Sequence, residues 1–483
     1  MGPDNFESEP VGTHSLNSSP GGVTPADRPI LIAACGTIFP TDIAHERLIE
    51  GALHQTAALW RAFVTASGRR RSLTDAMAEE IALAPQGLPV AAELVEWLKA
   101  QHAAGRPLFL LPDSAAGLAH QGPLAGIAGL LSPDDALPAS IDTRWRGGFT
   151  FVGDRRQHPA IASAAAAHVT VSARADGGMQ GARIEADFSR AAASLSDWLR
   201  AVRPHHWAKN LMIFIPFLLD RGWTDADDLV RMPLGFAVLI LVVSATYLFN
   251  DLSDVGADRR HWSKHRRPIA RGAIPIAHAA AATAGGLAIG LFLGWLLSPA
   301  FAGFLLLYVA LTVLYSVYLK TIPLLDALVI AMLFTSRLTM GIALTGDRFS
   351  EWLLTFAMFF FFDLALAKRH AELLRSQEHA NALSRRGYVA EDAALTLVVG
   401  VGSGIAALVI MIVFLVLDAF QRNTFLHPNW LWAIPLLLAI WLGRIWILAH
   451  RGAMPDDPIT FALRDRSSLS LGVFVAVSFL LAL

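Results

Sequence analysis

Long apolar runs constrain the fold of this chain more than any other feature. Residues 196–483 contain about nine of them, each roughly 17–25 residues long, which is the length that an α-helix needs to cross a bilayer. The runs are 207–222, 233–249, 277–298, 301–319, 323–345, 352–368, 393–417, 429–448 and 467–483. Because backbone polar groups in lipid must be satisfied within the segment, each run is expected to be helical. The second half is therefore predicted to be an α-helical integral membrane bundle of about nine transmembrane helices.

The composition agrees with a membrane protein. Only 16% of the residues are charged, whereas soluble globular proteins carry about a quarter. The single cysteine, Cys35, excludes an internal disulfide framework. We expect the lipid bilayer as a partner and no nucleic acid, and the sequence does not indicate an oligomeric state.

Basic residues in the predicted loops indicate how the bundle is oriented. Lys and Arg gather after the even-numbered runs, at Arg259, Arg260, Lys264, Arg266, Arg267, Arg271, Lys320, Lys368, Arg369, Arg375, Arg385, Arg386, Arg451, Arg464 and Arg466. The alternate loops contain few positive charges. Since an excess of Lys and Arg marks cytoplasmic loops, we expect the even-numbered loops and the N-terminal half on the cytoplasmic side of the inner membrane.

The N-terminal half differs in character from the membrane half. Short apolar runs that resemble buried strands lie at 29–35, 107–112, 149–154 and 168–172, and apolar residues recur at helical spacing over 42–66 and 88–104. This alternation predicts a cytoplasmic α/β domain with a parallel sheet over 29–175. The polar segment 1–28 is predicted to be a disordered lead-in without a signal peptide. Residues 176–195 are predicted to be a linker to the membrane domain, 196–483.

Three carboxylates follow the second apolar run directly, in the stretch NDLSDVGADRR at 250–260. Asp251, Asp254 and Asp258 are spaced i, i+3 and i+7, so on a continuous helix they lie on one face. Carboxylate oxygens suit Mg²⁺, which often bridges to substrate phosphates, and Asn250 adds a further polar group. Scattered acids on a solvated helix end are the alternative interpretation.

Basic residues next to these acids favour the metal interpretation. They are Arg259, Arg260, Lys264, Arg266 and Arg267. Acids that hold a metal beside bases that hold phosphate predict a diphosphate substrate. The metal would neutralise the leaving pyrophosphate and help to break a C–O bond.

The stretch NDLSDVGADRRHWSKHRRPIARGAIP resembles the first aspartate-rich motif of the UbiA-type membrane prenyltransferases. RPHHWAKN at 203–210 and YSVYLK at 315–320 extend the resemblance, which covers roughly 200–483. It implies a nine-helix bundle whose cytoplasm-facing cavity opens sideways to lipid. It also implies that Asp251, Asp254 and Asp258 bind Mg²⁺ and, with Glu372, act in catalysis. The substrate-binding residues that it implies are Lys209, Asn210, Asn250, Arg259, Lys264, Arg267, Tyr315, Lys320, Lys368 and Arg369.

A second motif departs from the common pattern of that family, in which two further acids hold a second Mg²⁺. The stretch FFDLALAKRHAELL at 361–374 has only Asp363 and Glu372 as acids, with Lys368 and Arg369 between them. This form, and RGYVAEDAAL at 386–395, resemble the branch that includes decaprenyl-phosphate phosphoribosyltransferase. That branch transfers 5-phosphoribosyl from phosphoribosyl pyrophosphate to a polyprenyl phosphate with release of pyrophosphate.

Other functions remain open at this stage. Prenyl transfer from a polyprenyl diphosphate to an aromatic acceptor such as 4-hydroxybenzoate is the alternative enzyme activity, and a lipid-binding scaffold or transporter is the non-catalytic one. Either enzyme would take a polyprenyl lipid and a diphosphate donor. Asp326 is interpreted as an acid at a helix N-terminus or a metal ligand. Arg337 lies deep in its run and is expected to be functional or paired within the bundle.

The N-terminal domain resembles the haloacid-dehalogenase-like phosphatases, on ILIAACGTIFPTD (30–42), PLFLLPDS (107–114) and FTFVGDRRQHP (149–159). That family begins with D-x-D-G-T, whose first Asp is the nucleophile and whose second is the acid/base. Ala33 and Cys35 stand at those positions, and His158 replaces an acid after Asp154. Because Ala cannot act as a carboxylate nucleophile, the domain is predicted to be catalytically inactive. Thiol chemistry at Cys35 is the alternative.

Overall fold

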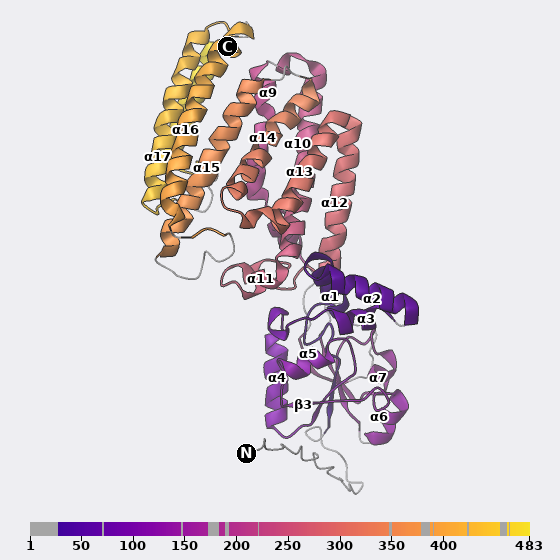
Figure 1. Cartoon of the computed structure of the whole chain (residues 1–483). Helices are drawn as coiled ribbons and strands as arrows, with labels where there is room; N and C mark the ends of the chain where they lie inside the picture. The colour runs from indigo at the N-terminus through magenta and orange to yellow at the C-terminus, as the bar shows by residue number, and fades with distance from the viewer. Residues whose placement is uncertain are drawn as a thin grey trace. The chain divides into compact units, whose positions relative to one another are not determined.

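The computed structural model describes residues 28–69, 72–145, 148–171, 183–188, 193–220, 222–346, 350–377, 387–389, 391–422, 425–454, 461–462 and 464–483. The chain divides into two compact units, Met1–Ala192 and Ala193–Leu483, which are named unit 1 and unit 2 below (Figure 1). Residues 1–27 of the predicted lead-in, 1–28, and part of the predicted linker, 176–195, lie outside the described residues.

Unit 1 is built on a six-stranded parallel sheet with the strand order β3-β2-β1-β4-β5-β6. The strands are β1 (Ile30–Ile32), β2 (Leu108–Leu110), β3 (Ala128–Leu130), β4 (Thr150–Val152), β5 (Ala167–Thr170) and β6 (Arg183–Asp187). Four of them fall in the runs that the sequence predicts to be strands, so the parallel α/β sheet is confirmed. Strand β6 lies within 176–195, and the prediction of a linker there was wrong for these five residues.

Helices cover both faces of this sheet, because successive residues of a strand point to opposite faces. Ile30 and Ile32 of β1 pack in one apolar cluster with residues of α4, whereas Leu31 packs in another with residues of α6 and α7. The helices are α1 (Ile43–Leu53), α2 (Thr56–Arg69), α3 (Leu73–Glu80), α4 (Ala92–Ala103), α5 (Ala116–Gln121), α6 (Pro138–Arg144) and α7 (Pro159–Ala164), with a 3₁₀ turn, η1, at Pro85–Gly87. The predicted helical segment 42–66 is thus two helices.

Strand β6 ends the sheet at one edge and is attached by an ion pair. The sequence RIEAD places a charge at every second position, and Ile184 is exposed. Glu185 accepts a hydrogen bond from the buried Arg106 at 3.0 Å and another from Thr150 at 3.0 Å. A polar strand of this kind carries no apolar run, which is why the sequence pattern missed it.

Unit 2 is helical throughout its described residues, and the long helices lie side by side (Figure 1). Its α-helices are α8 (Leu195–Val202), α9 (Phe214–Leu219), α10 (Ala226–Ser253), α11 (Val255–Arg260), α12 (Ile276–Leu297), α13 (Pro299–Val317), α14 (Leu325–Thr345), α15 (Glu351–Gln377), α16 (Asp392–Leu417), α17 (Ala433–His450) and α19 (Arg466–Ala482). Its 3₁₀ segments are η2 (Pro204–Ile213), η3 (Gly222–Thr224), η4 (Lys264–Arg266), η5 (Leu319–Thr321), η6 (Ala419–Arg422) and η7 (Pro428–Trp432).

Six helical segments in the described part of the chain are long and apolar enough to cross a membrane. They are Ala226–Ser253, Ile276–Leu297, Pro299–Val317, Leu325–Thr345, Asp392–Gln421 and Pro428–His450. Helix α19 is apolar but shorter, and α15 is long but ends in charged residues. The membrane bundle is therefore confirmed, whereas nine spans stay a prediction.

The first apolar run, 207–222, is not one continuous α-helix as the sequence predicts. It comprises η2 and the short α9, followed by η3. Pro216 contributes to the interruption because it has no N–H to donate to the carbonyl of Met212. The broken segment packs closely against α14, where a Cβ added to Gly341 would lie 2.2 Å from the backbone oxygen of Ile213.

Helix α14 belongs to both apolar cores of unit 2. Ala327, Ala331 and Leu338 pack with residues of α15, α16 and α17, whereas Met340 and Leu344 pack with α9, α10 and α13. Both ends of this helix are consequently fixed by neighbours on two sides. Side chains at its first turn are held in place relative to α13 and α15.

Candidate active site

The aspartate-rich stretch lies where α10 ends. Asn250 and Asp251 are on the last turn of α10, Asp254 is its C-cap residue, and Asp258 is on the next helix, α11. The prediction that the three carboxylates share one face of a continuous helix was therefore wrong. The chain leaves the helix at Asp254, and Asp258 is brought back toward Asp251 by a separate short helix.

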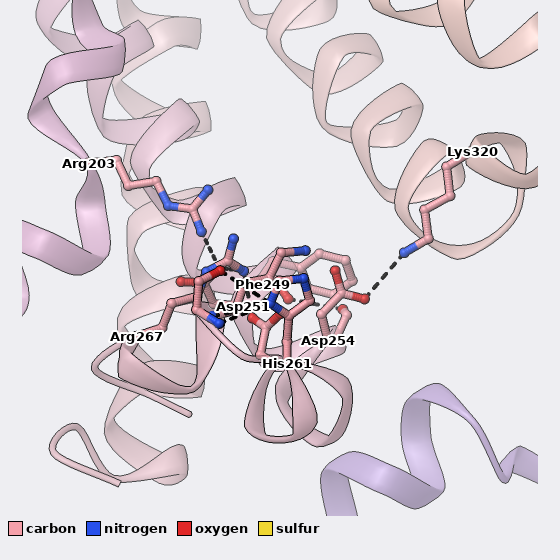
Figure 2. A network of polar contacts seen from close by, with 11 residues as sticks. Arg203, Phe249, Asp251, Asp254, His261, Arg267 and Lys320 are labelled. Carbon is pink, nitrogen blue, oxygen red and sulfur yellow. Dashed lines mark hydrogen bonds and ion pairs between the residues drawn. The ribbon is translucent and has the colours of Figure 1, made fainter. Parts of the chain in front are cut away.

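Asp251 is 3% exposed and lies between two arginines (Figure 2). Arg203 reaches its Oδ1 from the junction of α8 and η2, and Nη1 of Arg267 donates to the same oxygen at 3.1 Å. The guanidinium of Arg203 also lies over the ring of Tyr247, 5.1 Å from its centroid. Two guanidinium groups thus compensate a carboxylate that water hardly reaches, as a buried charge requires.

Arg267 also joins Asp251 to Asp258. Its Nη1 donates to Oδ2 of Asp258 at 2.5 Å, so oxygens of two carboxylates converge on one positively charged nitrogen. Burial raises the pKa of the Asp258 carboxyl, and the charges of Arg267 and Lys264 oppose that rise. A small cation could take the place of that nitrogen, because both oxygens already face a positive atom.

The side chain of Asp254 points away from Asp251 and Arg267 and contacts a different element. Nζ of Lys320, on η5, lies 3.2 Å from its Oδ1, and both side chains are partly exposed (Figure 2). Among the described residues, no three His, Cys, Asp or Glu side chains are grouped closely enough to hold a metal ion. These six residues, Arg203, Asp251, Asp254, Asp258, Arg267 and Lys320, are named the first polar cluster below. That the three aspartates bind Mg²⁺ together stays a prediction.

A second group of charged residues lies on α15 and the first turn of α14. Nε of Arg369 donates to Oδ2 of Asp326 at 2.6 Å, and Arg369 also pairs with Glu372. Nζ of Lys368 lies 3.8 Å from Glu372, and the Tyr388 hydroxyl donates to Oδ1 of Asp326 at 2.6 Å. The five residues Asp326, Lys368, Arg369, Glu372 and Tyr388 are named the second polar cluster below.

The segment 315–326, which comprises the end of α13, the connection with η5 and the first residues of α14, contacts both clusters. The hydroxyl of Ser316 donates to Oδ1 of Asn250, next to Asp251, and Lys320 reaches Asp254. At the other end of the segment, Asp326 binds Arg369. Tyr315 lies close enough to Arg369 to interact with it electrostatically. The structure therefore brings the predicted residues Asn250, Tyr315 and Lys320 to the clusters.

Two other predicted substrate-binding residues contact α14 instead. Asn210 is fully buried, and its Oδ1 accepts a hydrogen bond from Nε of Arg337 at 2.9 Å. Nζ of Lys209 lies 6.0 Å from the centroid of the Phe334 ring. Arg337, whose partner the sequence leaves unnamed, also donates to the carbonyl of Leu333 and lies over the rings of Tyr308 and Phe334. These contacts tie η2 and α13 to the middle of α14.

The remaining predicted residues have structural contacts of their own. Nε of Arg259 donates to the carbonyl of Ala270 at 3.0 Å, which closes the loop after α11. Lys264, on η4, lies near Asp258. The buried Asp363 accepts from Nε1 of Trp446 at 2.7 Å and so joins α15 to α17.

Sequence reasoning missed four residues of the site: Arg203, Ser316, Asp326 as a partner of Arg369, and Tyr388. Each lies in or beside one of the motifs quoted above, but its distance along the sequence from other polar residues does not identify its partner. A buried Asp at the start of a predicted membrane helix was the one signal available for Asp326. The two clusters together offer several cations and carboxylates, which suits phosphorylated ligands with a divalent cation.

Comparisons with known proteins find similarity in sequence and in structure. Residues 212–464 match the model of the UbiA prenyltransferase family. An uncharacterized protein of Sinorhizobium fredii, y4nM, is 35% identical over 477 residues, covering 94% of this chain and 91% of that protein. Decaprenyl-phosphate phosphoribosyltransferase of Mycobacterium tuberculosis is 29% identical over 276 residues, covering 56% of this chain and 88% of that enzyme. The structure of a UbiA homologue from Archaeoglobus fulgidus bound to GPP and Mg²⁺ aligns with a TM-score of 0.45 at 15% identity, covering 59% of this chain and 98% of that one.

Proposed function

The chain belongs to the UbiA prenyltransferase family and is a membrane-embedded transferase, and from that premise we propose that it transfers a 5-phosphoribosyl group from phosphoribosyl pyrophosphate to a polyprenyl phosphate. Pyrophosphate is the other product. The reaction is proposed to depend on Mg²⁺ and to take place at the two polar clusters.

The composition of the second polar cluster carries this proposal. Lys368 and Arg369 stand on α15 beside Glu372, so two cations accompany the two acids, Asp326 and Glu372, in this part of unit 2. An acceptor that is itself a phosphate calls for more positive charge than a neutral phenol does. Similarity to a relative named decaprenyl-phosphate phosphoribosyltransferase points in the same direction.

In this proposal the first polar cluster binds the diphosphate donor. Asp251, Asp254 and Asp258 would hold Mg²⁺; the convergence of Asp251 and Asp258 on Arg267 supports two of these ligands, whereas Asp254 contacts Lys320. When bound, the ion would supply positive charge for the leaving pyrophosphate. Arg203 and Lys320 approach the acids from two different elements and would bind the terminal oxygens of the donor.

The chemistry requires no protein nucleophile. The bond between ribose C1 and a pyrophosphate oxygen breaks with its electron pair on the oxygen, and an ionised oxygen of the lipid phosphate forms the new bond to C1. Because that oxygen carries no proton at neutral pH, no strong general base is needed. The chain's own role is to position two anionic substrates and to neutralise the charge that develops on the leaving group.

We place these clusters at the cytoplasmic face of the inner membrane, where phosphoribosyl pyrophosphate is soluble and available. Basic residues in the loops after α10, α13 and α15 support this orientation, since positive charge is retained on the cytoplasmic side. Unit 1, which precedes the bundle, would lie on the same side.

A paired assay on the full-length protein in detergent with Mg²⁺ tests the function. One reaction contains phosphoribosyl pyrophosphate and a polyprenyl phosphate, and the other contains a polyprenyl diphosphate and 4-hydroxybenzoate. We expect mass spectrometry to find a phosphoribosylated lipid in the first reaction only. A prenylated ring in the second would support the alternative activity, in which Asp363 and Glu372 serve the second metal site. No product in either would contradict both.

Lys320→Met is expected to raise the KM for the diphosphate donor about tenfold, because a hydrogen bond to a charged group contributes roughly 1.5–3 kcal/mol. Steady-state kinetics with varied donor at saturating lipid would measure the change. Arg231→Met is the matched control, since Arg231 is an exposed cation near the opposite end of α10 from Asp251. An equal rise in the KM for the donor in both variants would show that the effect is not specific to Lys320.

We further propose that unit 1 has no phosphatase activity. Ala33 directly follows β1, and Cys35 is held by a hydrogen bond from its backbone N–H to Oδ2 of Asp113 at 3.0 Å. Burial raises the pKa of the Cys35 thiol and lowers that of His158. A thiol that stays protonated is a weak nucleophile, which argues against thiol chemistry as well.

A further inference from the structure

A single tyrosine hydroxyl connects three parts of unit 2 that are distant in sequence. Tyr388 is 5% exposed, and its hydroxyl accepts a hydrogen bond from the backbone N–H of Leu324 at 2.8 Å. The same hydroxyl donates to Oδ1 of Asp326 at 2.6 Å, while Oδ2 of Asp326 accepts from Arg369. Burial, together with the carboxylate, raises the pKa of Tyr388, so the hydroxyl keeps the proton that it donates.

The carboxylate of Asp326 is therefore shared between two donors. Asp326 is 0% exposed, and each of its oxygens has one partner: Tyr388 on one side and Arg369 on the other. Without the hydroxyl, Oδ1 would be buried without that hydrogen bond, which is costly for a charged group. The orientation of the carboxylate, and with it the orientation of the Arg369 guanidinium, thus depends on Tyr388.

The backbone around this tyrosine is held in conformations that few residues adopt. Leu324 has φ 64°, which is uncommon for a residue with a side chain, and its N–H is the one that Tyr388 binds. Gly387 has φ +69°, and a Cβ added there would lie 2.3 Å from the backbone oxygen of Thr321. Such conformations persist where the surroundings over-determine them and are found disproportionately at functional sites.

The two acids and two bases of the second polar cluster balance in formal charge, so an anion would be bound by a donor of Arg369 that neither carboxylate uses. Arg369 presents its Nε to Asp326 and its Nη1 to Glu372, and Nη2 has no hydrogen-bond partner among the described residues. Lys368 lies one helical position away and contacts Glu372 at 3.8 Å. A guanidinium that is fixed on two sides can present its remaining donors in one direction.

We propose that Tyr388 and Asp326 are positioning residues that fix the Arg369 guanidinium for binding the phosphate of the polyprenyl phosphate acceptor. The inference rests on the proposed function and adds to it the site of the second substrate. The first polar cluster, with its three carboxylates, takes the metal and the diphosphate donor, and the second takes the single phosphate of the lipid. Both residues act through Arg369 and touch no reacting atom.

Tyr388→Phe in the full-length protein tests the inference, because it removes one oxygen and keeps the ring. We expect the KM for polyprenyl phosphate to rise about tenfold, while the KM for phosphoribosyl pyrophosphate changes by less than about twofold. Asp326→Asn and Arg369→Lys should act in the same direction, and Arg369→Lys sets the largest effect. Tyr318→Phe is the matched control, since Tyr318 is 60% exposed on the same connection.

A purely structural role would give a different result. It would lower Tm and the active fraction, and so lower kcat, without changing the KM for the lipid. An unchanged KM for polyprenyl phosphate in both Tyr388→Phe and Asp326→Asn would overturn the inference while leaving the proposed function intact.

Direct binding of polyprenyl phosphate in the absence of donor separates the two proposals. Weaker binding by Tyr388→Phe in a protein that makes no phosphoribosylated lipid would support the inference and overturn the proposed function. A wild-type protein that neither turns over nor binds polyprenyl phosphate would overturn both.

Discussion

Asp251→Asn is expected to lower kcat/KM by about 10³-fold, which corresponds to roughly 4 kcal/mol of transition-state stabilisation. The carboxylate contacts Arg203 and Arg267 at once and is almost completely buried. Asparagine keeps the shape but removes the charge, so the site would lose a proposed ligand for Mg²⁺, and two guanidinium groups would lose their shared counter-charge. Initial rates over a range of Mg²⁺ concentrations would measure both the loss of activity and the weaker dependence on metal.

Asp227→Asn is the control for this substitution. Asp227 lies in the first turn of the same helix, at the opposite end from Asp251, and is exposed. The control should retain wild-type kinetics, and both variants should elute as folded protein. Wild-type turnover by Asp251→Asn at every Mg²⁺ concentration would remove the first polar cluster from the reaction.

Gly341→Ala is expected to destabilise unit 2 by about 3 kcal/mol, because an added Cβ would lie 2.2 Å from the carbonyl oxygen of Ile213. The neighbour is a backbone atom and cannot rotate away as a flexible side chain could. Helix α14 and the broken segment formed by η2 and α9 would have to separate, which would also disturb the contact between Asn210 and Arg337. We expect a fall in Tm of about 10 °C in a thermal unfolding experiment in detergent.

Gly303→Ala serves as its counterpart in α13. Nothing lies within 4 Å of a Cβ added to Gly303, so alanine there should be neutral or slightly stabilising. Equal melting temperatures for the two variants would mean that the helices can separate at Gly341 without cost.

The first polar cluster shows how far the sequence alone could go. Asp251, Asp254, Asp258 and Arg267 come from one short stretch and were predicted as a group from residue type and spacing; the structure brings Asp251, Asp258 and Arg267 into contact, whereas Asp254 contacts Lys320. Arg203 and Lys320 reach the same acids from 48 and 66 positions away. Such contacts depend on how the helices pack, and the spacing of residues in a single sequence does not predict that packing.

The second polar cluster was predicted less completely for the same reason. Lys368, Arg369 and Glu372 lie on one helix and could be recognised as a group. Tyr388 and Asp326 are 62 positions apart, and their hydrogen bond depends on an unusual backbone conformation at Leu324. Helical periodicity predicts neither a positive φ nor the turn that it makes possible.

Errors in the predicted fold have equally local causes. The apolar run 207–222 is only slightly shorter than a spanning helix, but length carries no information on whether the chain forms α-helical or 3₁₀ hydrogen bonds. Strand β6 was assigned to a linker because its residues are charged, and its place in the sheet depends on Arg106, far away in the sequence.

The charged strand β6 has a consequence for how unit 1 meets other extended chains. An edge strand offers unpaired N–H and C=O groups to any other extended chain, and sheets that leave such an edge apolar tend to aggregate. A strand from another chain that paired with β6 would have to desolvate the charges of Arg183 and Asp187, which are both exposed. The edge therefore discourages sheet extension, which helps this α/β unit to stay dispersed while the long helices of unit 2 are inserted into the bilayer.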